Sequence, residues 1–154
     1  MNTNAVYFNG LGHQYKKAGN IKEALDAYDR AVNLDPSNMD YYYNRGCCYR
    51  LLEKWNEAIC DYDKVIKSDP TDASAYWERG ICYARMNSNQ KAIDDFNNAI
   101  RHRPNKADYY ISRAISYCSL SDKYNAISDF EQALKIDPYN ANVKKMLEMV
   151  KNVE

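Results

Sequence analysis

The sequence has no excess of charge of either sign. Lys plus Arg and Asp plus Glu each number 21 among 154 residues, so the formal net charge is zero. A nucleic-acid-binding protein usually carries a marked basic surplus. A membrane-spanning helix needs about 20 predominantly apolar residues in succession, and the apolar runs here are short. We therefore expect neither a nucleic-acid partner nor a membrane-inserted segment.

Signals for export, redox chemistry and catalysis are also lacking. The start MNTNAVYFNG has neither the basic nor the long apolar segment of a signal peptide, so a cytoplasmic location is expected. The five cysteines include no Cys-x-x-Cys pair, which favours reduced thiols over a disulfide framework. No zinc-ligand spacing, Gly-rich phosphate loop or HExxH motif occurs. We expect no metal, no cofactor and no enzymatic activity.

Proline and glycine are few, four and five respectively, but the prolines are evenly spaced. A constant period of this length predicts internal structural repeats. The prolines stand 34 residues apart, at Pro36, Pro70, Pro104 and Pro138. The period divides the chain into four units and a tail, namely 5–38, 39–72, 73–106, 107–140 and 141–154.

Equivalent positions in the four units carry similar residues. Counted from the first residue of each unit, position 11 is always tyrosine, position 20 always alanine, and positions 4 and 24 always aromatic. Positions 4, 8 and 11 share one helical face, and positions 20, 24 and 27 share another. A polar stretch such as KAGN (17–20) between them is typical of a turn, and the residue before proline resists a helical conformation. Each unit is therefore predicted to be a helical hairpin.

This pattern of aromatic, glycine, tyrosine, alanine, aromatic and proline resembles the tetratricopeptide repeat (TPR). The resemblance covers residues 5–138, with alanine replacing glycine at Ala114. It implies an all-α fold, a right-handed α-solenoid of four helix-turn-helix repeats whose first helices line a concave face. The tail 141–154 keeps an apolar stripe and a polar outer face, so we expect it to form a capping helix. All of 1–154 is expected to be a single domain.

Arginine and aspartate are present together or absent together at positions 7 and 23. The first unit has Leu11 and Ala27 there, and the other three units have both charges. This co-occurrence predicts bidentate Arg–Asp pairs across each hairpin, although the arginines could instead line a site for an anionic ligand. The expected pairs are Arg45 with Asp61, Arg79 with Asp95, and Arg113 with Asp129.

The resemblance also implies which residues line the concave groove, since the family builds it from positions 2, 5, 6, 9, 12 and 13. The resulting candidates are Asn9, His13, Tyr43, Asn44, Cys47, Arg50, Trp77, Glu78, Ile81, Arg85, Ile111, Ser112 and Ile115. Tyr43 and Trp77 are not needed by the hairpin core, so we expect them to face the groove and a partner. Ile81 and Ile115 could equally pack against neighbouring first helices.

These features favour a non-enzymatic protein-interaction module that holds a peptide or helix with bulky apolar residues. The alternative is a self-assembling scaffold that forms homo-oligomers. Family members that grip the acidic tails of heat-shock proteins use a carboxylate clamp, of which only Asn44 is matched here. Because Glu78 would also repel a carboxylate, we do not expect a chaperone-tail adaptor. Vicinal Cys47 and Cys48 are interpreted as packing residues.

Overall fold

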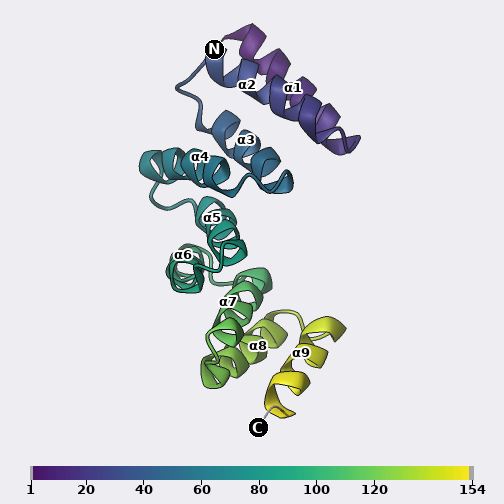
Figure 1. Cartoon of the computed structure of the whole chain (residues 1–154), viewed down its shortest axis with the longest axis vertical. Helices are drawn as coiled ribbons and strands as arrows, with labels where there is room; N and C mark the ends of the chain where they lie inside the picture. Colours follow the sequence, from purple (N-terminus) through teal and green to yellow (C-terminus); the bar gives the residue numbers. More distant parts are fainter. Residues whose placement is uncertain (1, 153–154) are drawn as a thin grey trace. The chain divides into compact units, whose positions relative to one another are not determined.

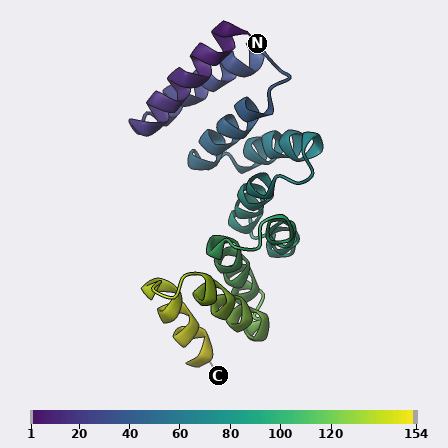
Figure 2. The same cartoon turned by 180° about the vertical axis from the view of Figure 1, so that it is seen from behind.

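The computed structural model describes residues 2–152 and contains nine α-helices over that range (Figure 1). The helices are α1 (Thr3–Lys17), α2 (Ile21–Leu34), α3 (Met39–Leu51), α4 (Trp55–Ser68), α5 (Ala73–Arg85), α6 (Asn89–His102), α7 (Ala107–Ser119), α8 (Lys123–Ile136) and α9 (Ala141–Asn152). Successive helices pair as antiparallel hairpins, α1 with α2 through α7 with α8, as the view from behind also shows (Figure 2). The predicted all-α fold of four helical hairpins and a final helix is confirmed, and it is consistent with a TPR solenoid.

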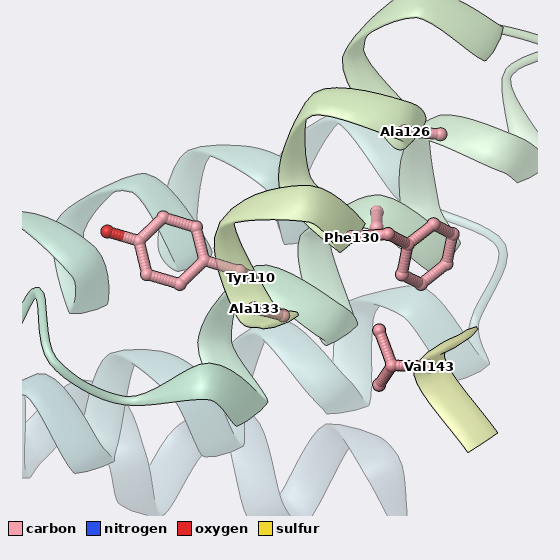
Figure 3. Packing of buried hydrophobic residues seen from close by; sticks show 6 residues of the cluster. Tyr110, Ala126, Phe130, Ala133 and Val143 are labelled. Carbon is pink, nitrogen blue, oxygen red and sulfur yellow. The ribbon is translucent and has the colours of Figure 1, made fainter. Parts of the chain in front are cut away.

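The chain forms two compact units, Met1–Thr71 with helices α1–α4 and Asp72–Glu154 with helices α5–α9. A single domain spanning both remains a prediction. In the second unit α9 packs against α8, where Val143 is only 2% exposed and joins the cluster around Phe130 and Tyr110 (Figure 3). Through this contact α9 covers the last hairpin. Over residues 2–152, no helix is both long and apolar enough to cross a membrane.

Close contact between an aromatic ring and a glycine fixes the separation of the paired helices. A Cβ atom added at Gly12 would lie 2.6 Å from the ring of Tyr28, and one at Gly80 would lie 2.6 Å from the ring of Phe96. Real Cβ atoms do not approach other atoms so closely, so these rings pack directly on the backbone of the first helix. The fourth hairpin differs, because the fully buried Ala114 places a methyl group at this position.

The turn of each hairpin contains one residue whose backbone is in the left-handed conformation, with a positive φ angle, at repeat position 15. Non-glycine residues rarely adopt this conformation, because their Cβ atom crowds the backbone. The four residues and their φ angles are Gly19 at 81°, Glu53 at 58°, Asn87 at 58° and Ser121 at 60°. The next amide then donates to a carbonyl five residues earlier, as Asn20 does to Tyr15 at 2.9 Å. This pattern ends the first helix as in a Schellman motif.

Candidate functional site

Each of the three expected arginine–aspartate pairs is in hydrogen-bond contact across its hairpin. Arg45 donates from Nε to Oδ2 of Asp61 at 2.8 Å and from Nη2 to Oδ1 at 2.6 Å. The other two pairs have the same geometry, with distances of 2.7–2.8 Å, and they are Arg79 with Asp95 and Arg113 with Asp129. Two parallel bonds to one carboxylate form the strongest arrangement available to an arginine side chain.

The same guanidinium groups lie between two tyrosines of their own helix. The Arg113 guanidinium carbon is 5.7 Å from the ring centroid of Tyr110 and 6.0 Å from that of Tyr117. Burial is the largest single effect on the pKa of Arg113 and lowers it, but the hydrogen bonds to Asp129 and the negative charge of that carboxylate together raise the pKa above its ordinary value. The arginine side chains are therefore held in structural pairs, and this geometry does not present them to an anionic ligand.

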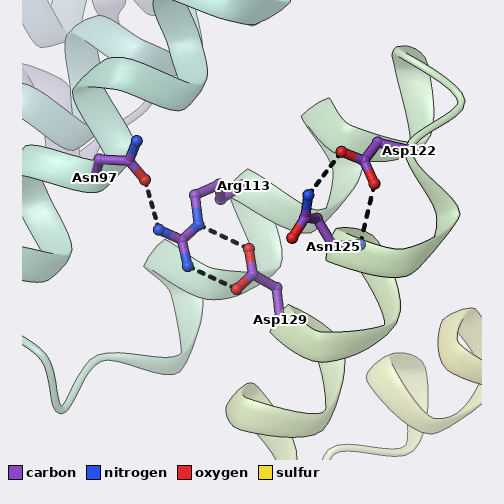
Figure 4. A network of polar contacts seen from close by, with 5 residues as sticks. All are labelled: Asn97, Arg113, Asp122, Asn125 and Asp129. Atoms are coloured by element: carbon purple, nitrogen blue, oxygen red, sulfur yellow. Dashed lines mark hydrogen bonds and ion pairs between the residues drawn. The ribbon is translucent and has the colours of Figure 1, made fainter.

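A third contact joins both Arg45 and Arg113 to the preceding hairpin. Nη1 of Arg45 donates to Oδ1 of Asp29 at 2.8 Å, joining α3 to α2. In the second unit, Nη1 of Arg113 donates to Oδ1 of Asn97 on α6 (Figure 4). Each of these arginines thus ties three helices together. The sequence analysis missed Asp29 and Asn97, although both occupy repeat position 25 and could have been found as a polar position in phase with the arginines.

In the first unit, three candidate groove residues form a polar cluster. Nδ2 of Asn44 on α3 donates to Oδ1 of Asn9 on α1 at 3.1 Å, and it lies 3.5 Å from Nε2 of His13. The other ring nitrogen of His13, Nδ1, lies 3.1 Å from the hydroxyl of Tyr28. Burial, and secondarily the charge of Lys16, lower the pKa of His13 below its usual 6.5. This surface therefore favours a neutral imidazole.

The remaining candidates of the first unit are half-buried or buried. Cys47 is 7% exposed, and its sulfur lies 3.6 Å from the hydroxyl of Tyr62, which donates to it. The Tyr43 ring stands edge-on to the same Tyr62, with centroids 5.8 Å apart, and is half-buried. Arg50 is also half-buried. Cys47 is therefore placed in the interior of the hairpin and not on a groove surface.

In the second unit, Trp77 bridges two first helices. Its Nε1 donates to Oγ of Ser112 on α7 at 2.9 Å, and its ring centroid is 5.7 Å from that of Tyr109. The hydroxyl of Ser112 in turn donates to the carbonyl of Asp108 at 2.8 Å. Trp77 is half-buried by these contacts, and its role as a groove residue stays a prediction. Glu78 beside it is 7% exposed.

A cavity of about 370 Å³ lies in the second unit, between α5 and α7 and next to the start of α6. Its volume falls within the range of about 300–1,000 Å³ found for ligand pockets. Ile115 is 45% exposed at its edge, and Phe96 lies at its buried side. The lining residues are Ile81, Ala84, Arg85, Asn89, Phe96, Ser112, Ile115, Ser116 and Ser119.

Four of the candidate groove residues are brought together in this cavity, namely Ile81, Arg85, Ser112 and Ile115. Ile111, another candidate, instead packs on the apolar cluster of the last hairpin. Sequence reasoning missed three lining residues of the first helices that lie one turn from a candidate, Ala84, Ser116 and Ser119, and helical spacing could have found them. Nothing in the repeat pattern indicated Asn89, which reaches the cavity from a second helix.

All five cysteines lie in the described part of the chain, where no disulfide joins them. Burial is the main cause that raises the pKa of the Cys48 thiol to about 11, and burial also raises that of Cys118. Thiolates are the reactive and metal-binding form. Within residues 2–152, no group of three or more His, Cys, Asp and Glu side chains is placed to hold a metal ion.

Comparison with known proteins agrees with the repeat pattern. A family model described as TPR repeat matches residues 12–49 and 48–87, and one described as Tetratricopeptide repeat matches 73–106 and 107–140. A crystal structure of MamA protein is similar to the chain, with a TM-score of 0.89 and 25% identity over 97% of this chain and 82% of that one. No curated protein gives a significant sequence match.

Two further solved structures share the fold. MamA 41-end from Desulfovibrio magneticus RS-1 has a TM-score of 0.90 and 18% identity, covering 96% of this chain and 84% of that one. YrrB, described as a TPR protein with an unusual peptide-binding site, has a TM-score of 0.85 and 22% identity, covering 94% of this chain and 74% of that one. At such low identity these likenesses concern the fold alone.

Proposed function

The chain belongs to the tetratricopeptide repeat family, whose members mediate protein–protein interactions and are typically non-catalytic, and we propose that it is a non-enzymatic module that binds a peptide segment of a partner protein. The observation that carries the proposal is the cavity between α5 and α7, which is lined by four of the residues that the family resemblance implies as groove residues. The peptide-binding site named for YrrB, a protein of the same fold, supports the proposal.

The chemistry of the cavity defines the segment that it suits. Ile81 and Ile115 supply an apolar surface, whereas Arg85 is exposed at the C-terminal end of α5. A branched aliphatic side chain of the peptide would bury apolar area between the two isoleucines, at roughly 25 cal/mol per Å². An acidic peptide residue one or two positions away would pair with Arg85. Because ordering a flexible peptide offsets much of the gain, we expect micromolar affinity.

The polar cluster of the first unit offers uncharged hydrogen-bonding groups, in contrast to the apolar and cationic lining of the cavity in the second unit. Asn9, His13 and Asn44 present amide and imidazole groups from two first helices. Such groups suit the backbone or amide side chains of an extended peptide, which offers both donors and acceptors. We assign this cluster an accessory role in peptide binding, since its members already form hydrogen bonds with one another.

The five thiols further support a location in a reducing compartment such as the cytoplasm.

A peptide selection followed by binding measurements tests the proposal. Peptides selected from a random library on the wild-type protein should be enriched in aliphatic residues close to Asp or Glu. Fluorescence anisotropy should then show that Ile115→Ala weakens binding about tenfold, the effect of losing part of one buried aliphatic side chain. Leu120→Ala is the matched control, since Leu120 is 47% exposed at the end of α7 but lies outside the cavity.

Charge is tested with a second matched pair. Arg85→Ala should weaken binding of the acidic peptides, whereas Arg101→Ala, at an exposed arginine of α6 outside the cavity, should leave it unchanged. If each cavity variant weakens peptide binding no more than its matched control does, the peptide binds outside the cavity. Light scattering of the purified protein over a range of concentrations separates this function from a self-assembling scaffold, for which the mass would rise with concentration.

A further inference from the structure

A second, smaller cavity lies between α1 and α2 in the first unit. Its volume is about 190 Å³, roughly six times the share of one water molecule in the liquid. It is therefore too small for a drug-sized ligand but large enough for the end of one side chain. The lining residues are Phe8, Leu11, Tyr15, Glu23, Asp26, Ala27 and Arg30.

The cavity lies at the repeat positions that hold an arginine–aspartate pair in the other hairpins. In the second hairpin, the Arg45 guanidinium carbon is 5.3 Å from the ring centroid of Tyr42 and 5.7 Å from that of Tyr49, and Asp61 binds the group. The first hairpin keeps the aromatic residues of these positions but has Leu11 and Ala27 in place of the charged pair.

Phe8 and Tyr15 are the aromatic counterparts of the two tyrosines that flank Arg45. The cavity thus has the aromatic walls of an arginine site, but leucine stands at the repeat position that holds the arginine in the other hairpins. It also retains negative charge, since the exposed Glu23 and Asp26 both line it. Aromatic faces and carboxylates together attract a cation more strongly than either group alone.

One cation, Arg30, already lines the cavity, but the second hairpin shows that the equivalent aromatic ring leaves room for a second. The Arg30 guanidinium carbon is 5.3 Å from the centroid of the Phe8 ring. Its counterpart in the second hairpin, Lys64, lies 4.5 Å from the centroid of Tyr42, while Arg45 contacts the same ring at 5.3 Å. An aromatic residue at this position therefore accommodates two cations at once.

We propose that the cavity between α1 and α2 binds the guanidinium group of an arginine carried by a partner protein. The partner's arginine would take the place that Arg45, Arg79 and Arg113 fill from within their own hairpins. Arginine suits the site better than lysine, because a planar guanidinium stacks against rings while its N–H groups reach carboxylates. The site lies in the first unit and is independent of the peptide cavity between α5 and α7.

NMR titration with a short probe peptide, acetyl-Gly-Arg-Gly-amide, tests the proposal. Amide resonances of the residues around the cavity should shift and saturate. The same peptide with citrulline, which has the shape of arginine but no charge, should bind at least about tenfold more weakly, since bonds to a charged group are worth that much. Equal binding of the citrulline peptide, or no saturable shift with the arginine peptide, would overturn the proposal.

Variants of the protein make the test specific. Leu11→Arg with Ala27→Asp rebuilds the charged pair of the other hairpins and fills the cavity, so it should abolish probe binding. Glu23→Gln with Asp26→Asn changes only exposed side chains and should weaken binding about tenfold. The matched control, Asp40→Asn with Glu57→Gln, neutralises two exposed acids outside the cavity and should have no effect.

Unchanged probe binding in both cavity variants would refute the site. Sedimentation velocity of the protein alone identifies the source of the arginine. If the wild type self-associates and the variant Leu11→Arg with Ala27→Asp does not, a second copy of the chain supplies the cation, and the assignment to a different partner protein is overturned. A wild type that stays monomeric while binding the probe supports the proposal as stated.

Discussion

Arg113 and Asp129 are joined by two parallel hydrogen bonds, from Nε to Oδ2 and from Nη2 to Oδ1, each 2.7 Å long (Figure 4). The Asp129 side chain is only 7% exposed. Replacing Arg113 by leucine leaves this carboxylate desolvated without its main counter-charge, so we expect the free energy of unfolding to fall by about 1–3 kcal/mol. Urea denaturation monitored by circular dichroism measures the loss.

The double variant Arg113→Leu with Asp129→Ala should recover much of that loss, because it recreates the Leu11 and Ala27 combination of the first hairpin. Residues in direct contact are expected to deviate from additivity in this way. If the double variant loses as much free energy of unfolding as the two single variants lose together, the pair does not act as a coupled unit.

Two glycines should respond in opposite directions to the same substitution. Neither Gly10 nor Gly19 has any atom within 4 Å of an added Cβ, so packing is not affected in either case. Gly10 lies inside α1, where alanine should stabilise by about 1 kcal/mol. Gly19 has a φ angle of 81°, where alanine should cost about 1–2 kcal/mol. Thermal and urea unfolding of the two variants measure both effects.

The turn angles extend this prediction to the other hairpins. Glu53 and Ser121 adopt the left-handed conformation at the position equivalent to Gly19, so glycine at either site should stabilise the protein by about 0.5–1 kcal/mol once its greater freedom in the unfolded chain is counted. No gain at either position would show that the turn is not strained there.

The cysteines should divide into two groups by their reaction with a thiol reagent. Cys60 and Cys118 are exposed, whereas Cys47, Cys48 and Cys82 are buried. Two thiols per chain should therefore react in the native state near neutral pH, and all five after unfolding. Since burial raises the pKa of Cys118, this thiol should react slowly for an exposed residue. Absorbance of the released thiolate counts the groups, and Cys60→Ser should remove one native-state equivalent.

Protonation of His13 should destabilise the first unit. The pKa of His13 is lowered by burial and by Lys16 from 6.5, so between its native pKa and 6.5 the unfolded chain binds more protons than the folded one. The stability that the neutral ring contributes is present above pH 6.5 and is lost as the pH falls through the native pKa. Protonation also makes both ring nitrogens donors, so the ring can no longer accept a hydrogen bond from either Tyr28 or Asn44.

Denaturation of the wild type and of His13→Gln from about pH 8 to about pH 5 checks this effect. The wild type should lose more stability over that range, and the C2 proton of His13 should titrate below 6.5 in the NMR spectrum. A native pKa at or above 6.5 would contradict the prediction.

The fold could be predicted because equivalent positions of the four hairpins carry similar residues, and three of the hairpins pack an aromatic ring on a glycine. The rings of Tyr28 and Phe96 leave no room for a Cβ atom opposite them, so glycine and the aromatic ring recur together at the period that the prolines mark. The left-handed turn residues could not be predicted in the same way. Glu53 and Ser121 have no intrinsic preference for that conformation, and it is the packing of the two helices that imposes it.

The candidate site was predicted less completely, because repeat position alone does not determine exposure. Position 9 holds Cys47, which is buried, and Ile115, which is 45% exposed at the same repeat position. The difference depends on the size of the residue and on its neighbours, which differ from repeat to repeat. The small cavity between α1 and α2 was also invisible in the sequence, although Leu11 and Ala27 marked the hairpin that contains it.

Trp77 and Ile115 separate stability from binding in the second unit. The Trp77 ring contacts Tyr109 and donates to Ser112, so Trp77→Ala removes packing and a hydrogen bond between α5 and α7. For a half-buried ring we expect a loss of about 1–3 kcal/mol, below the range for fully buried aromatic residues. Trp77→Phe keeps most of the packing and should lose only about 1 kcal/mol, the value of the hydrogen bond.

Ile115→Ala should change the free energy of unfolding by no more than about 0.5 kcal/mol, because the side chain is largely exposed, yet it should weaken peptide binding. Urea denaturation and native-state hydrogen exchange of the α5 and α7 amides measure the stability of each variant, and anisotropy measures binding by the same samples. If Trp77→Ala instead keeps full stability and loses binding tenfold, the indole is a groove anchor, as the repeat pattern alone predicted. The contacts of Trp77 with α7 would then contribute little, and the binding surface would have to include position 5.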